Sequence, residues 1–189
     1  MERGYLYLLI GALLKASTLL PFNMNVIPFF SLEFFGYLLI IMGIRYMRTS
    51  EKELKNSYYF TIATLMIRFI LPLVRTTNFN FFSILTVLNI FFSVGIFFWI
   101  FKAEYMWSPH TTKRMDLLIY SIVSLIYLVI YGIFIFPMIS FRILSQNAIS
   151  YSFEVLRFIN ILYYGVLIYI LVKLYLEARK NTPGFDRWG

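Results

Sequence analysis

The chain contains no cysteine and a single histidine, His110, among its 189 residues. Without cysteine there is no disulfide, no thiolate nucleophile and no cysteine-ligated metal. One histidine cannot supply the cluster of imidazole ligands found in metal sites of the zinc type. The sequence therefore predicts no metal and no other cofactor.

Charged residues are also scarce, at 14% of the chain, whereas a soluble domain carries about a quarter. Hydrophobic residues make up 60%, and the mean hydropathy is +0.76. Apolar runs of about 18 or more residues recur, which is typical of helices that cross a bilayer. The sequence predicts an all-α polytopic membrane protein whose residues 1–189 form a single transmembrane domain.

The apolar runs predict a bundle of six transmembrane helices joined by short connections. Their expected ranges are roughly 4–21, 32–48, 57–75, 80–102, 115–138 and 152–178. Short connections favour antiparallel neighbours packed as hairpins. The second range is short for a span of about 20 residues, so this helix is expected to stand nearly upright or to cross a thin region of the bilayer.

The positive charges are distributed unevenly between the two predicted sides of the membrane. One side has only Arg75 and Arg142; the other has Arg3, Arg45, Arg48, Lys52, Lys55, Lys102, Lys113, Arg114, Lys173, Arg179, Lys180 and Arg187. Because cytoplasmic loops carry the excess of Lys and Arg, both termini are expected in the cytoplasm of a plasma-membrane protein. Short basic clusters between apolar runs also explain the net charge of +8 without a nucleic-acid partner.

Three prolines and three glycines recur at matching places along the chain. A proline lies near the outer end of each odd helix (Pro21, Pro72, Pro137), and a glycine lies in each even helix (Gly36, Gly95, Gly165). The pattern predicts three hairpin repeats around an axis along the membrane normal. The alternative is that any three hairpins of one topology share such marks.

Polar residues inside the predicted spans are the candidate site. An ionisable group there costs roughly 2.5–3.5 kcal/mol to insert, so it is expected to face protein or water. Glu154, Arg157 and Asn160 follow one another at helical spacing, which predicts a Glu154–Arg157 pair on one face. The predicted lining of an outward-facing polar cavity is Lys15, Glu33, Arg68, Asn89, Glu154, Arg157 and Asn160, with Tyr163 and Tyr164 nearby.

This set carries three positive and two negative charges, which favours an anionic or zwitterionic small molecule or a lipid headgroup. Two alternatives need no ligand. Lys15 and Arg68 could pair with Glu33 and Glu154 only to hold the bundle together. Their long side chains could also reach outward to the lipid headgroups.

Small residues on the first helix predict a close helix contact. Gly11, Ala12 and Ala16 form a patch in which Ala12 and Ala16 have the small-xxx-small spacing. The partner is either another helix of this chain or a second subunit. The basic and aromatic tail with Arg187 and Trp188 suits the anionic cytoplasmic leaflet or a cytoplasmic protein.

No arrangement of residues in the sequence predicts catalysis. Asp116 follows Thr111 and Thr112 as a helix-capping acid would, and His110 is expected in a solvated loop. The Ser, Thr and Tyr residues have no neighbouring base in the sequence. A lipid-modifying enzyme is therefore the least supported of the functions considered.

The chain length, six spans, cytoplasmic termini and Ala12/Ala16 patch resemble the substrate-capture subunits of energy-coupling-factor vitamin transporters. This resemblance implies a vitamin-binding outer cavity and a separate ATP-driven module. The chain differs in being richer in Phe and Tyr and poorer in Ala and Gly. The leading hypothesis is a non-enzymatic carrier or transporter-binding subunit, and the alternative is an accessory or assembly subunit of a larger membrane complex.

Overall fold

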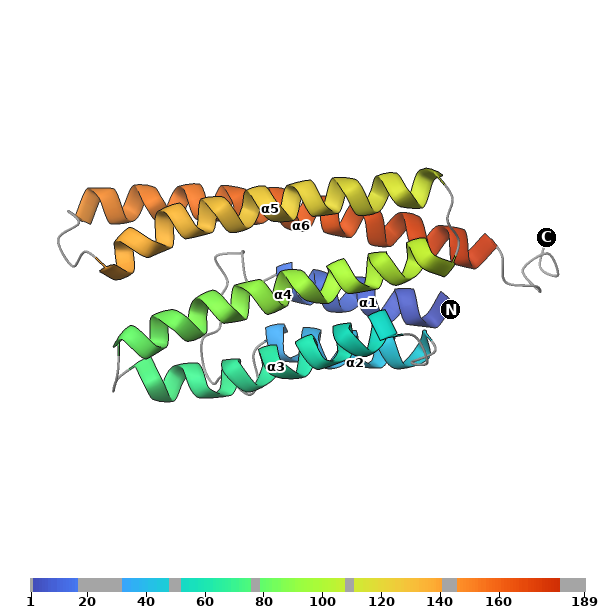
Figure 1. Cartoon of the computed structure of the whole chain (residues 1–189), viewed down its shortest axis with the longest axis horizontal. Helices are drawn as coiled ribbons and strands as arrows, with labels where there is room; N and C mark the ends of the chain where they lie inside the picture. The colour runs from blue at the N-terminus through green and yellow to red at the C-terminus, as the bar shows by residue number, and fades with distance from the viewer. Residues whose placement is uncertain are drawn as a thin grey trace.

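The computed structural model describes residues 2–16, 32–47, 52–75, 79–107, 111–140 and 146–180, and these residues form six α-helices (Figure 1). The helices are α1 (Glu2–Ala16), α2 (Leu32–Tyr46), α3 (Lys52–Arg75), α4 (Phe79–Trp107), α5 (Thr111–Ser140) and α6 (Gln146–Lys180). The all-α fold predicted from the apolar runs is confirmed.

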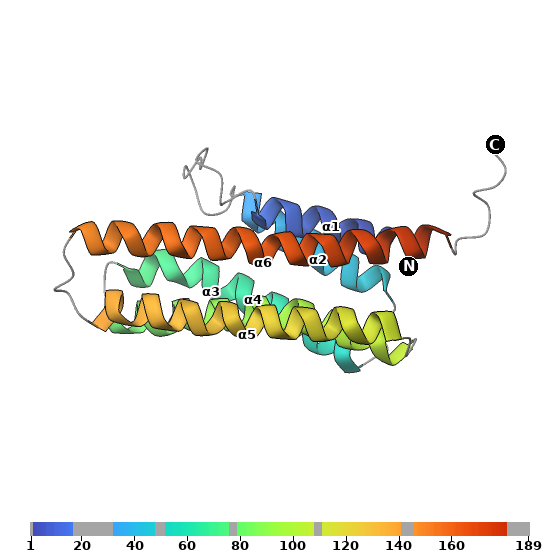
Figure 2. The ribbon, with the colours of Figure 1, turned by 90° about the horizontal axis from the view of Figure 1, so that it is seen from above.

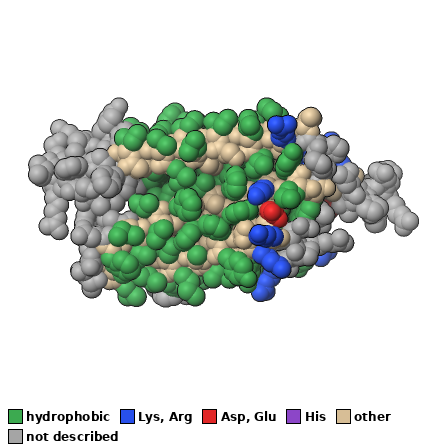
Figure 3. Space-filling view, in the orientation of Figure 1, with side chains coloured by type: hydrophobic (Ala, Val, Ile, Leu, Met, Phe, Trp, Pro, Cys, Tyr) green, Lys and Arg blue, Asp and Glu red, His purple; other side chains and the backbone are tan. Residues whose placement is uncertain are grey.

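The six helices lie side by side along one long axis, and consecutive helices run in opposite directions (Figures 1 and 2). The start of α1, the end of α2, the start of α3, the end of α4, the start of α5 and the end of α6 all lie at the same end of the bundle, which we call the terminal end. In the view of Figure 3 the Lys and Arg side chains gather toward the terminal end. The remaining surface in that view is largely hydrophobic.

Four helices are long and apolar enough to cross a membrane, which makes the chain a candidate multi-pass membrane protein. The four segments are Lys52–Val74, Ile84–Trp107, Thr111–Ile133 and Glu154–Lys180. Large apolar side chains point outward along them, with Leu73 exposed by 71% and Leu125 by 64%. Such a surface suits hydrocarbon better than water.

The helix ends differ from the predicted ranges in a consistent way. α3 begins at Lys52 instead of 57, α4 continues to Trp107, and α6 begins at Gln146. Apolar runs mark where a helix leaves the hydrocarbon, but Lys, Glu and Gln are good helix formers and continue the backbone hydrogen bonding beyond that point. The predicted ends of the first two helices, at 21 and 48, lie outside the described residues.

Neighbouring helices form a closed ring, in which each helix packs against the next in sequence and α6 packs against α1. α1 and α4 are therefore on opposite sides of the ring. Their side chains nevertheless meet, because Tyr5 of α1 hydrogen-bonds Glu104 of α4 and Lys15 of α1 hydrogen-bonds Ser93 of α4. The axis of the ring is filled by side chains at both of these levels.

The α1–α2 hairpin is packed backbone against backbone. A Cβ atom on Gly36 would lie 2.8 Å from the carbonyl oxygen of Gly11, and one on Gly43 would lie 2.9 Å from that of Gly4. Each helix thus presents two glycines seven residues apart, and the two pairs have the same antiparallel register. Close approach of this kind is the usual role of small residues between membrane helices.

The predicted small-residue patch is thus used within the chain. Gly11 faces α2, and Ala12 is fully buried in the main core. Ala16 is partly buried at the end of α1. The patch residue that sets the α1–α2 distance is Gly11, because its missing side chain makes room for the backbone of α2.

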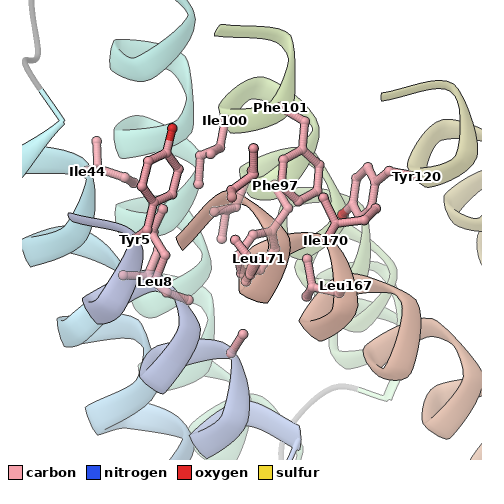
Figure 4. Packing of buried hydrophobic residues seen from close by; sticks show 14 of the residues in the cluster. Tyr5, Leu8, Ile44, Phe97, Ile100, Phe101, Tyr120, Leu167, Ile170 and Leu171 are labelled. Atoms are coloured by element: carbon pink, nitrogen blue, oxygen red, sulfur yellow. The ribbon is translucent and has the colours of Figure 1, made fainter. Parts of the chain in front are cut away.

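The main hydrophobic core contains buried side chains from all six helices (Figure 4). Leu8 of α1, Ile44 of α2, Phe97 of α4 and Leu171 of α6 are among its fully or almost fully buried members. A second, smaller cluster of Ile67, Leu71 and Leu85 lies between α3 and α4 alone. In the described residues, α3 and α4 therefore pack as a separate pair beyond the common core.

The three glycines of the predicted repeat have different surroundings. Gly36 touches the α1 backbone, Gly95 lies against the ring of Phe60, and Gly165 has no atom within 4 Å of the place where its Cβ would be. They therefore share no packing role. Pro72 lies inside α3 and Pro137 inside α5, while Pro21 is outside the described residues.

Candidate functional site

Lys15, Tyr37 and Ser93 meet inside the ring and form the centre of the candidate site. Lys15, near the end of α1, is 2% exposed, and its Nζ donates a hydrogen bond to Ser93 Oγ of α4. The hydroxyl of Tyr37 in α2 lies 3.2 Å from the same Oγ, and Lys15 Nζ lies 4.3 Å from the centre of the Tyr37 ring. An aromatic face and a hydroxyl thus stabilise a buried ammonium group.

An ion pair joins α2 to α3 beside this centre. Arg68 Nη2 lies 2.6 Å from Glu33 Oε1, with the Arg68 side chain 44% exposed and the Glu33 side chain 15% exposed. Lys15 lies against the same first turns of α2 as Glu33, because a Cβ atom on Gly36 would be 3.1 Å from Lys15 Cγ. The structure therefore brings three of the predicted site residues together, with two positive charges and one negative charge among them.

Asn89 lies one helical turn from Ser93 on α4, so the two side chains are neighbours on the helix surface. Its side chain is 5% exposed, and the described part of the chain offers its Oδ1 atom no hydrogen-bond partner. On α3, Ser57 donates to the carbonyl of Ile96, which fixes the antiparallel register of the two helices. That register places the buried Thr64 opposite Asn89.

Asn160 belongs to a different group, formed by tyrosines of α5 and α6. Its Oδ1 accepts a hydrogen bond of 2.8 Å from Tyr127, and its Nδ2 donates to Tyr131 and to the carbonyl of Leu156. The side chain is therefore satisfied by the fold itself. Its place at the α5–α6 contact indicates a structural role.

The two predicted tyrosines have distinct neighbours. Tyr163 is buried, stacks on Tyr127 at 4.4 Å between ring centres, and shares a 2.6 Å hydroxyl contact with Tyr120. Tyr164 is half-buried and lies within electrostatic range of Tyr37, Glu33 and Arg68. Tyr163 therefore belongs to the tyrosine group of α5 and α6, and Tyr164 packs edge-on against it.

Glu154 and Arg157 do not join the central residues. Both are exposed on α6, and among the described residues they form no ion pair with each other. Helical spacing brought their positions onto one face, but that face points away from the ring. We call the residues that do meet or lie within one turn of each other the central polar cluster: Lys15, Glu33, Tyr37, Arg68, Asn89 and Ser93.

A second charged network lies toward the terminal end. Glu104 is 3% exposed and is held by the Tyr5 hydroxyl and by Lys113 Nζ at 2.9 Å. Asp116 and Lys173 pair at 2.7 Å between α5 and α6. These contacts join α1, α4, α5 and α6, and they give Asp116 a structural partner beyond the expected capping role.

Tyr37, Ser93 and Glu104 were not among the residues predicted for the site. Tyr37 and Ser93 resemble many other aromatic and small residues of apolar helices, so no local signal distinguishes them. Glu104 carried a signal in the sequence, because it is an acid directly after an apolar run. In the structure, the hydroxyl of Tyr5, in the distant helix α1, hydrogen-bonds it.

The central polar cluster offers an ammonium, a guanidinium, two hydroxyls and a carboxamide to a bound group. Such donors suit a negatively charged oxygen group. No group of three His, Asp or Glu residues that could hold a metal ion occurs in the described ranges. The sequence did not show that Lys15 and Ser93 are close together. Their hydrogen bond brings the Lys15 side chain of α1 to the polar face of α4.

Comparison with known proteins yields no relative: no family model, no curated protein and no solved structure matches this chain. The functional argument therefore depends on the geometry of the central polar cluster.

Proposed function

We propose that the chain is a plasma-membrane protein with six spans and cytoplasmic termini, which binds an anionic or zwitterionic small molecule or lipid in the central polar cluster. It acts as a carrier or as the binding subunit of a transporter. The basic terminal end supports the orientation, because Lys and Arg gather on the cytoplasmic side of membrane proteins. The four apolar segments support the membrane location.

The observation that carries the proposal is that Lys15, held by Ser93 and Tyr37, and the Glu33–Arg68 ion pair both lie at the start of α2. Charged groups inside membrane helices are costly and typically mark binding sites or pathways. Two positive charges against one negative charge leave the cluster complementary to a single anion. Residues 17–31, which join α1 to α2, contain no charged residue that could change this balance.

Native mass spectrometry of the full chain released from mild detergent tests the proposal. A discrete small molecule or lipid should remain bound, and it should be lost from Arg68→Gln. Arg157→Gln is the matched control, because Arg157 is an exposed arginine outside the central polar cluster. Retention of the same ligand by both variants, or a bare chain throughout, would refute the proposal. A second polypeptide in fixed ratio would favour the accessory-subunit alternative.

A further inference from the structure

Lys15 and Asn89 of the central polar cluster are buried inside the ring, whereas Arg68 is exposed at its surface, so a ligand that reaches the buried residues needs a route between helices. The α1–α2 hairpin is held tightly by its glycines, and α3–α4 is held by Ser57 and the small apolar cluster. Between these two units, the Glu33–Arg68 ion pair is the salt bridge that joins α2 to α3 in the described residues. Arg68 is also the most exposed charged residue of the cluster, so an entering anion meets it first.

We infer that the ligand is a phosphodiester of single negative charge next to a hydrogen-bond donor, and that it enters between α2 and α3 by replacing Glu33 on Arg68. This inference depends on the proposed function and specifies its ligand. An anionic phospholipid headgroup with hydroxyl or ammonium groups has this chemistry, and so does the same headgroup free in water.

The charge of the ligand follows from the charge of the cluster. With Lys15 protonated, Lys15 and Arg68 against Glu33 leave one positive charge, which one phosphodiester neutralises. A guanidinium binds two oxygens of a phosphate side by side, as it does a carboxylate. Glu33 and the ligand therefore compete for the same atoms of Arg68.

The donor requirement follows from Asn89. Its Oδ1 is buried and has no hydrogen-bond partner among the described residues, one turn away from Ser93. A buried acceptor without a donor is unfavourable, so such groups call for a functional explanation. A hydroxyl or ammonium group beside the ligand phosphate would supply the donor that Asn89 lacks.

The experiment uses the full chain in mild detergent with three short-chain phospholipids, whose retention is titrated by native mass spectrometry. Phosphatidylglycerol has one net charge and hydroxyl donors, phosphatidylethanolamine has no net charge and an ammonium donor, and phosphatidylcholine has neither net charge nor donor. We expect affinity to fall in that order. Soluble glycerophosphoglycerol, which is the phosphodiester headgroup without its acyl chains, is added in parallel, and its binding at comparable affinity would mean that the natural ligand is a water-soluble phosphodiester.

Two variants test whether Glu33 and Asn89 act in ligand binding or only stabilise the fold. Glu33→Gln removes the competing charge and should raise the affinity for phosphatidylglycerol by about tenfold, the equivalent of about 1.4 kcal/mol. Asn89→Leu should keep phosphate binding but abolish the preference for phosphatidylethanolamine over phosphatidylcholine. Asn160→Leu, which removes a buried asparagine outside the cluster, should leave that preference intact.

The outcomes distinguish this inference from the proposed function. If no lipid and no soluble phosphodiester binds the unmodified chain, the inference is refuted, and the proposed function fails with it only if native mass spectrometry also finds no other small molecule on the chain. If lipid binds and is lost from Arg68→Gln, but Glu33→Gln does not raise affinity, then the ion pair is structural and the exchange is refuted while the proposed function stands. If Asn89→Leu keeps the donor preference, the assigned role of Asn89 is wrong.

Discussion

A Cβ atom on Gly11 would lie 2.7 Å from the carbonyl oxygen of Gly36, so the α1 and α2 backbones touch where these two glycines face each other. This contact places the end of α1 against the start of α2, with Lys15 and Glu33 next to it in sequence. The geometry of the central polar cluster thus depends on two residues that have no side chain.

Replacing Gly11 with alanine should destabilise the protein by about 1–3 kcal/mol, because backbone atoms cannot move aside for the new methyl group. The measurement is the thermal unfolding midpoint in detergent. Gly165→Ala is the control, since no atom lies within 4 Å of the place where its Cβ would be. That variant should be neutral or gain about 0.5–1 kcal/mol from helix propensity. Equal effects of the two variants would contradict the tight α1–α2 contact.

The two buried asparagines should respond in opposite ways to replacement by leucine. Asn160→Leu leaves the Tyr127 and Tyr131 hydroxyls without their partner and should cost about 1–3 kcal/mol. Asn89→Leu removes an acceptor whose Oδ1 is unsatisfied, so stability without ligand should be unchanged or slightly higher. Unfolding midpoints in ligand-free detergent test this difference. A large loss on Asn89→Leu would mean that its amide is needed for the fold.

Removing Lys113 should destabilise the terminal end, because Glu104 is 3% exposed and would lose its cation. The loss should be below the value of about 3–5 kcal/mol for a fully buried pair, since the Lys113 side chain keeps 19% exposure. Lys113→Met should cost much less in a Glu104→Gln background. The exposed Lys55 supplies the control, Lys55→Met. Additive losses in the double variant would argue against the pair.

Because the chain contains no cysteine, its orientation in the membrane can be measured by labelling single introduced cysteines. In intact cells, a membrane-impermeant maleimide should label Thr77→Cys, in the α3–α4 connection, without permeabilisation. Lys52→Cys, at the terminal end, should be labelled only after the cells are opened. The reverse pattern would invert the topology, and labelling of both in intact cells would exclude six spans with cytoplasmic termini.

The number and order of the helices could be predicted because the apolar runs are separated by short polar segments. The Glu33–Arg68 pair was offered as an alternative to a ligand site, and the structure contains it. The Glu154–Arg157 pair was predicted from the same kind of spacing and is not present among the described residues. Spacing shows which residues share a face of one helix, but not which neighbour that face meets.

Contacts across the ring could not be predicted from the sequence. Lys15 reaches Ser93, 78 positions further along the chain, only because six helices close into a ring. The same closure separates Asn89 from Asn160, which the sequence predicted to line one cavity. Asn89 lies one turn from Ser93, the partner of Lys15, and Asn160 lies between tyrosines, since rotation about each helix axis is set by packing.

The contact between α6 and α1 also has a consequence for biogenesis. The ribosome makes α1 first and α6 last, so the buried faces of Leu8 and Ala12 have no final neighbour until almost the whole chain has been synthesised. If α1 spans the membrane as proposed, Lys15 would meet lipid during that interval unless another part of the chain shields it. The α1–α2 hairpin is complete soon after α2 emerges, so its glycine contacts give α1 a first docking partner while the later helices are inserted.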